Sequence, residues 1–178
     1  TEPAATPLKP LVVEERGKLV SVRVWAFHAQ KMPESVARRL CASASRSMAA
    51  ELRKLGCEGV EVEQQVEHLP GGNPAAGVMI TAVTSTGCTL ASSGLLERRD
   101  KPETVGAAAA ETMGAELAHG GAMDEHLTDQ VIVFMALAEG RSRIRTGPLS
   151  LHTQTSIHFS TLLTGATFTV TPTEENTA

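Results

Sequence analysis

Hydrophobic and polar positions alternate along several stretches of the chain, and each such stretch predicts a strand. In residues 18–28, valine and alanine alternate with polar or aromatic residues, which indicates a strand with one buried face. Residues 60–66 alternate with glutamate and glutamine, which indicates an edge strand with one solvated face. Residues 78–84 and 88–91 predict a hairpin that turns near Gly87.

Helical signals separate these strands. Pro33 followed by glutamate is typical of a first helical turn and predicts a long helix to about residue 55, which Gly56 ends. A second Pro-Glu pair predicts a helix over residues 102–117. The order strand, helix, strand, hairpin, helix predicts a separate α+β module over residues 18–117.

The last third of the chain predicts a second packed unit. An apolar stripe at helical spacing marks a helix through Leu127, Val131, Phe134 and Ala138. Another helix is expected over residues 154–163, and short strands at residues 11–13, 141–145, 149–151 and 168–170. The fold class that follows is α+β, a two-layer arrangement in which helices pack on one face of each sheet.

Composition narrows the possible partners and compartments. The 178 residues are 42% hydrophobic with a formal charge of −4, which is typical of a globular chain without general attraction to nucleic acid. Only five residues are aromatic, which argues against a stacking platform for many bases. Three widely spaced cysteines fit neither a disulfide framework nor a zinc site. We therefore expect a reduced, intracellular protein of the nucleus or the cytoplasm, between which composition does not choose, and no membrane partner.

Two polar clusters are candidates for chemistry. On a helix, His126, Asp129 and Gln130 share one face, where an acid and an amide can bind a purine edge or ribose hydroxyls. The alternative is a solvated helix N-terminus whose acids complement the helix dipole. His152 lies between an apolar segment and a helix start. It is a candidate nucleophile, base or ligand, and the alternative is an ordinary packed histidine.

A metal site is a further alternative for these histidines. Its ligands would be His126, Asp129, His152 and His158, but their spacing matches no recognised ligand pattern. We therefore predict no metal site within this chain.

Two long motifs resemble a known family. Residues 120–138, GGAMDEHLTDQVIVFMALA, and residues 142–158, SRIRTGPLSLHTQTSIH, resemble consecutive signatures of the RNA 3'-terminal phosphate cyclases, the second in its eukaryotic form. Shorter similarities occur at residues 15–17 and 84–88, so the resemblance extends from about Leu11 to Val170. The order and length of the motifs make the resemblance specific.

The resemblance implies a mechanism and a set of site residues. The histidine that corresponds to His152 attacks the α-phosphate of ATP and carries AMP, which passes to an RNA 3'-phosphate before the 2'-hydroxyl closes a 2',3'-cyclic phosphate. The nucleotide site would include His126, Leu127, Thr128, Asp129 and Gln130. A divalent metal, magnesium or manganese, is expected with ligands outside this chain. The expected partner is RNA with a 3'-phosphate end, and no DNA.

The resemblance also implies a domain arrangement. Residues 1–17 would be a tail and a strand of the main cyclase domain, a fold shared with the enolpyruvate transferases. Residues 18–117 would be its inserted α+β domain, similar to the C-terminal domain of a bacterial translation initiation factor. Residues 118–172 would return to the main domain, followed by a tail at 173–178.

Two features separate this chain from complete family members. Complete family members are about twice as long as this chain, so we expect it to carry the nucleophile without much of its site. Residues 95–100 and Leu90 also depart from the family pattern. The alternative is a non-catalytic RNA- or protein-binding module, as in the ribosome-biogenesis branch of the family. That branch lacks the histidine at the position of His152.

Overall fold

The chain forms two compact units in a computed structural model that describes residues 6–172. Unit 2 comprises Gly17–Ala118, and unit 1 comprises the segments that precede and follow it. The expected α+β module, residues 18–117, differs from unit 2 by one residue at each end. The tail expected at residues 173–178 lies outside the described residues.

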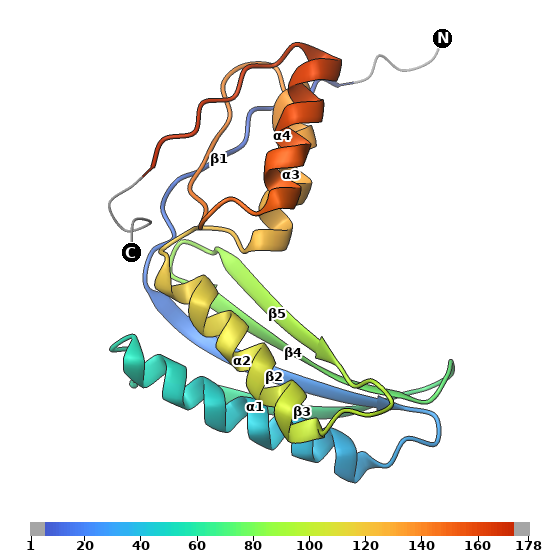
Figure 1. Ribbon diagram of the computed structural model, residues 1–178. Helices are drawn as coiled ribbons and strands as arrows, with labels where there is room; N and C mark the ends of the chain where they lie inside the picture. The colour runs from blue at the N-terminus through green and yellow to red at the C-terminus, as the bar shows by residue number, and fades with distance from the viewer. Residues whose placement is uncertain (1–5, 173–178) are drawn as a thin grey trace. The chain divides into compact units, whose positions relative to one another are not determined.

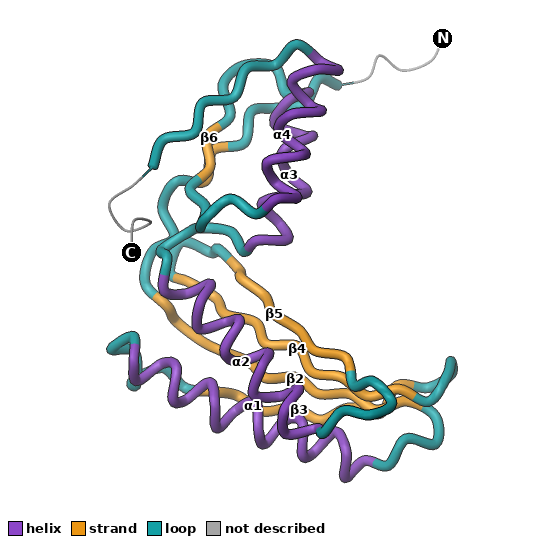
Figure 2. Tube along the Cα trace, viewed as in Figure 1, coloured by secondary structure: helices purple, strands orange, loops and turns teal. Residues whose placement is uncertain are grey.

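Unit 2 is a four-stranded sheet with two helices on one face, as Figures 1 and 2 show. The strands lie in the order β3-β2-β4-β5, with β2 and β3 parallel and the other pairs antiparallel. Its elements, in chain order, are β2 (Leu19–Ala29), α1 (Glu34–Lys54), β3 (Val62–Leu69), β4 (Ala75–Thr84), β5 (Thr89–Leu95) and α2 (Pro102–Ala118).

The alternation predicted in β2 decides which face the helices cover. Val22, Val24 and Ala26 are buried beneath the helices, whereas Trp25 and Phe27 lie on the opposite face. Pro33 directly precedes α1, one residue before the helical position expected for it, and makes no side-chain capping hydrogen bond. Gly56 follows the end of α1 with a φ of +67°, where a glycine costs little. The expected alternation and helix end are confirmed, and β3 is an edge strand as predicted.

Small residues bring α1 and α2 close together. A methyl group on Gly106 of α2 would meet the Leu40 carbonyl oxygen of α1 at 2.5 Å. Close by, the Ser43 hydroxyl donates to the Glu103 carbonyl oxygen at 2.6 Å. Arg39 donates two hydrogen bonds to the Glu103 carboxylate, at 2.6 and 2.9 Å, and these bonds lower the pKa of Glu103. The two helices therefore form one rigid layer.

Unit 1 consists of two helices that follow short parallel strands. Strand β1 (Val12–Val13) pairs with β6 (Arg143–Ile144), and an isolated parallel bridge joins Met123 to Thr146. Helix α3 (Glu125–Leu137) follows the first bridge residue, and α4 (Leu151–Thr164) follows the second. Each helix buries two of its own residues: Thr128 and Ile132 in α3, and Thr153 and Ser160 in α4.

Two of the predicted strands are wrong. Residues 149–151 do not form a strand, because the Ser150 hydroxyl accepts a hydrogen bond from the Thr153 amide and starts α4 three residues before the predicted helix. Residues 168–170 are irregular, since no strand pairs with them in the part of the chain that the structure describes. An extended segment without a pairing partner is not a strand.

The apolar stripe predicted for α3 is present but largely unburied. Leu127 is 39% exposed and Phe134 is 58% exposed, whereas Thr128 is buried. Helix α4 adds further exposed apolar side chains, namely Leu151, Phe159, Leu162 and Leu163. Among residues 6–172, no helix is long and apolar enough to cross a membrane. The exposed face of α3 and α4 is therefore a surface that the described residues of unit 1 leave open.

Candidate active site

Helices α3 and α4 lie side by side and run in the same direction (Figure 1). Each begins just after one partner of the parallel bridge between Met123 and Thr146. One turn into the helices, the Ser156 hydroxyl of α4 donates a hydrogen bond to the Asp129 carboxylate of α3 at 2.5 Å. Because the helices are parallel and paired at this level, their N-termini lie at the same end of unit 1.

The two candidate histidines occupy equivalent positions at this end. Asp124 caps α3 by accepting the Leu127 amide at 2.8 Å, and Ser150 caps α4 by accepting the Thr153 amide at 3.2 Å. His126 and His152 are each the second residue after a cap, and both side chains are exposed. The sequence placed His152 at a strand exit, whereas the structure places it in the first turn of α4.

Exposure leaves the imidazole of His152 available for chemistry. Within residues 6–172, its ring nitrogens have no hydrogen-bond partner, so neither nitrogen is held by the fold. The amides of the first helical turn have no partners inside a helix, and they favour anions together with the helix dipole. Two such ends side by side give a surface suited to phosphate oxygens.

The remaining predicted residues divide into exposed and internal groups. Gln130 is exposed, and Asp129 is half-buried with one carboxylate oxygen bound to Ser156. Thr128 is buried, and its hydroxyl bonds to the Asp124 carbonyl oxygen and to the Thr146 hydroxyl, at 2.8 and 2.9 Å. Thr128 therefore holds the start of α3 against the strand layer and does not present its hydroxyl to solvent.

A glycine contact below the helix starts was not foreseen from the sequence. Gly121 and Gly147 approach so closely that a methyl group on Gly121 would lie 2.7 Å from the Gly147 amide nitrogen. The His119 ring lies against both glycines and accepts the Gly121 amide proton at 3.1 Å. Their only sequence signal is that glycine is common in turns, which does not indicate that two distant glycines are in contact.

An apolar groove runs between α3 and α4 farther along the helices. Its volume is about 270 Å³. It is lined by three residues of α3 and six of α4: Val133, Ala136, Leu137, Thr155, Ser156, Phe159, Ser160, Leu163 and Thr164. The groove begins at the level of the Asp129–Ser156 hydrogen bond and continues away from the histidines. It is therefore continuous with the exposed apolar face and separate from the helix starts.

Metal ligation and cysteine chemistry find no support in the described residues. Among residues 6–172, no group of three or more histidine, cysteine, aspartate or glutamate side chains is arranged for a metal ion, so His126, Asp129, His152 and His158 do not form a site. All three cysteines are free, and burial raises the pKa of Cys41.

Basic side chains, which can pair with phosphates, occur in both units. Arg98, Arg99 and Lys101 precede α2 in unit 2, whereas Arg141, Arg143 and Arg145 lie around β6 in unit 1. Arg143 approaches Glu14 at 4.0 Å.

Comparison with known proteins is consistent with this architecture. Residues 14–118 match the model of the RNA 3'-terminal phosphate cyclase insert domain. The chain is 37% identical, over 99% of its length, to a Dictyostelium discoideum protein named "Probable RNA 3'-terminal phosphate cyclase", of which it covers 40%. It is 38% identical over 74% of its length to the RNA 3'-terminal phosphate cyclase of Pyrobaculum neutrophilum, of which it covers 36%.

A third relative extends the comparison. The RNA 3'-terminal phosphate cyclase of Staphylothermus marinus is 34% identical over 89% of this chain, which covers 44% of that protein. The chain thus spans about two fifths of the length of the curated relatives that it matches. The insert-domain match covers more than half of the residues, and on that basis the chain belongs to the RNA 3'-terminal phosphate cyclase family.

Proposed function

We propose that this chain carries the nucleophile of an ATP-dependent RNA 3'-terminal phosphate cyclase, and that the nucleophile is His152. The observation that carries the proposal is the pair of adjacent helix N-termini, each with an exposed histidine as its second residue. Such an end offers the positive end of the helix dipole to phosphate oxygens and an unbound imidazole nitrogen beside them. These two features support nucleotidyl transfer to a histidine at this surface.

The proposed reaction has three displacements at phosphorus. An imidazole nitrogen of His152 attacks the α-phosphorus of ATP, and pyrophosphate leaves as the nitrogen–phosphorus bond forms. An oxygen of the RNA 3'-phosphate then attacks the same phosphorus, which breaks the bond to His152 and transfers AMP to the RNA. Finally the RNA 2'-hydroxyl attacks the 3'-phosphorus, AMP leaves, and the proton of the hydroxyl passes to solvent or to a base.

We assign the other residues at this end to nucleotide binding and positioning. His126 and Gln130 are exposed near the same helix start and would contact the base or ribose, with Leu127 packing against them. Asp129 is bound to Ser156, and Thr128 is internal, so their proposed role is to fix the spacing of α3 and α4. The described residues contain no metal-ligand cluster, and a divalent ion would be held by residues outside this chain.

The exposed apolar face supports a further part of the proposal. Phe134, Leu162 and Leu163 are more than half exposed, beside an apolar groove between the two helices. Surfaces of this kind are normally covered by another protein segment. Since the chain spans about two fifths of its curated relatives, we propose that the remaining part of a cyclase covers this face and completes the site.

The test is adenylylation with α-labelled ATP and a divalent metal. The chain is assayed alone and together with the part of the Dictyostelium relative that it does not cover. Label that survives alkali, is lost in acid and disappears in His152→Asn is expected, because a phosphoramidate has these stabilities. His158→Asn is the matched control, since His158 is an exposed histidine of the same helix and should still be labelled.

Two outcomes would contradict the proposal. Labelling that persists in His152→Asn excludes this residue as the nucleophile. If the assembled protein is not labelled at all, the chain is better described as a non-catalytic binding module of the same family.

A further inference from the structure

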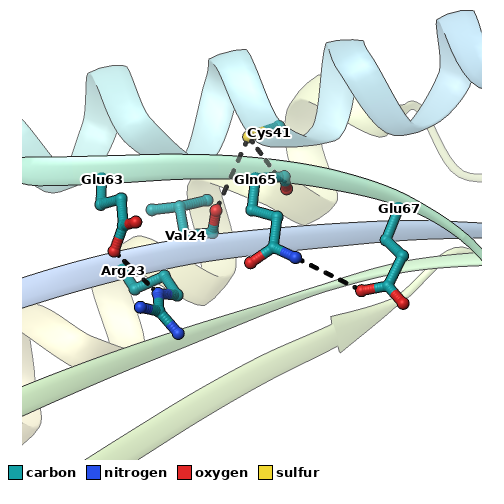
Figure 3. Close-up of polar contacts among 6 residues, drawn as sticks. All are labelled: Arg23, Val24, Cys41, Glu63, Gln65 and Glu67. Atoms are coloured by element: carbon teal, nitrogen blue, oxygen red, sulfur yellow. Dashed lines mark hydrogen bonds and ion pairs between the residues drawn. The ribbon is translucent and has the colours of Figure 1, made fainter.

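The sheet of unit 2 has one face that its own helices leave open. Side chains from alternate positions of all four strands form it: Arg23, Trp25 and Phe27 from β2, Glu63, Gln65 and Glu67 from β3, Met79, Thr81 and Val83 from β4, and Ala91, Ser93 and Leu95 from β5. Figure 3 shows Arg23, Glu63, Gln65 and Glu67 on this side of the sheet, opposite Cys41 of α1. We call this surface the open sheet face.

The charged side chains of the open sheet face all come from β2 and β3, and most of them are acidic. Between Lys54 and Arg98 the chain has no lysine or arginine but has five glutamates, so β3, β4 and β5 contribute no basic side chain. Arg23 is therefore the only cation on the open sheet face, and it is paired with Glu63 at 2.8 Å. Without cations to neutralise phosphates, the face is poorly suited to nucleic acid.

The glutamate beside Trp25 remains available to a cationic ligand. Glu67 accepts hydrogen bonds from the Trp25 indole at 2.9 Å and from the Gln65 amide at 3.4 Å, but it forms no ion pair within residues 6–172. The Trp25 ring stacks on Phe27 with centroids 5.3 Å apart. A half-exposed indole held beside an unpaired carboxylate offers a cation both a ring face and a counter-charge.

The same glutamates lie on an edge strand. In the described part of the chain β3 pairs only with β2, which leaves the backbone amides and carbonyls on its other side without a strand partner. An extended segment can add to such an edge by backbone hydrogen bonds, and its alternate side chains then lie over one face of the sheet. Glu63 and Glu67, four residues apart, would meet side chains of the added strand at the same spacing.

We propose that the β3 edge and the Trp25 side of the open sheet face form a docking site for an extended protein segment that carries arginine or lysine. We choose a cationic protein segment over RNA because the acidic face attracts positive charge and repels phosphates. The proposal concerns unit 2 alone and is independent of the chemistry of His152. The opposite expectation is that the glutamates only prevent strand addition, as charges on edge strands often do.

The probe is a fluorescein-labelled octapeptide of alternating arginine and threonine, titrated with the full chain at low salt. Binding is followed by anisotropy and, with unlabelled peptide, by the emission of Trp25, which is the sole tryptophan in a chain without tyrosine. We expect saturable binding that weakens with added salt and changes Trp25 emission. An octapeptide of alternating glutamate and threonine should not bind.

Two charge-matched variants separate docking from general attraction. Glu67→Gln should weaken the peptide dissociation constant about three- to fivefold, as expected for one exposed cationic contact. Glu111→Gln removes the same charge from the exposed face of α2 and should leave the constant unchanged. Trp25→Leu, assayed by anisotropy after a check of its unfolding curve, should weaken binding to a similar extent.

Several results would overturn the proposal. If Glu67→Gln and Glu111→Gln weakened binding equally, the binding would be explained by the net charge of the protein and not by a docking site. If the arginine peptide did not bind, the glutamates would serve only to prevent strand addition at the β3 edge. Tighter binding of octauridylate than of the arginine peptide, with quenching of Trp25, would make the open sheet face an RNA platform instead.

Discussion

The closest contact between α1 and α2 gives a sharp prediction about unit 2. Gly106 has no side chain where α2 crosses α1, and an added methyl group would meet the Leu40 carbonyl oxygen at 2.5 Å and the Ala44 amide nitrogen at 3.0 Å. Both atoms belong to the backbone of a helix, so they cannot rotate away. Gly106→Ala therefore has to push the two helices apart.

The magnitude follows from two opposing effects. Overpacking in a buried contact costs about 1–3 kcal/mol, whereas alanine is about 1 kcal/mol better than glycine inside a helix. We expect a net loss of up to roughly 2 kcal/mol in the free energy of unfolding. For a unit of this size, that corresponds to a fall of up to about 16 °C in the unfolding temperature.

Gly114→Ala is the matched control on the same helix. The atoms nearest its added methyl group all belong to the Glu51 side chain, with Oε2 at 2.7 Å and Cγ at 2.8 Å, and this side chain can rotate away from its partner Lys54. The lost ion pair is worth about 0.3–0.5 kcal/mol against the same gain in helix propensity, so stability should be unchanged or slightly higher.

Urea unfolding followed by the emission of Trp25 measures both variants, because this residue belongs to β2, whose other face packs against the helices. If Gly106→Ala is as stable as Gly114→Ala, the helices are not in backbone contact at this point and the reasoning fails.

Three further predictions concern a thiol, an ion pair and a helix cap. Cys41 is buried with a raised pKa, so a thiol reagent at pH 8 should modify the other two cysteines first, and equal rates for all three would contradict its burial. The pKa of Glu103 is lowered by its hydrogen bonds to Arg39, so that pair stabilises the fold above the ordinary glutamate pKa of about 4.3 and is lost as the pH falls through the lower folded value. Thermal unfolding should show Glu103→Gln less stable than the wild type at pH 7 by a margin that shrinks as the pH is lowered, and a pH-independent difference would refute this. Ser150→Ala should cost about 1 kcal/mol and reduce helical circular dichroism, and unchanged stability would argue against the cap.

The elements of unit 2 could be predicted because each satisfies a local rule. The alternation around Val24 has period two, and the helix after Pro33 begins with a fixed φ and ends at Gly56 with a positive one. Burial then follows from the period, since only one face of the sheet is covered by helices. Local pattern and tertiary packing agree throughout this module.

Unit 1 was harder to predict because its packing does not follow local pattern. The stripe through Phe134 has helical period, yet it faces solvent, while Thr128 is buried by hydrogen bonds to Asp124 and Thr146. Periodicity reports which residues can form an apolar face but not whether a partner covers it. The contact of Gly121 with Gly147 joins residues far apart in sequence, and no single-sequence pattern encodes it.

The topology of unit 2 also has a consequence for protein engineering. Helix α2 runs antiparallel to β5, because Gly94 lies against Val105 and Ser92 bonds to Ala109, so the helix ends where β2 begins. The first and last residues of unit 2 consequently leave the module at the same end, as Figure 1 shows. A short glycine linker joining these ends, with new termini opened in the loop after Leu69, would give a circular permutant of unit 2. The same geometry would allow Gly17–Ala118 to be inserted as a domain into a surface loop of an unrelated host protein.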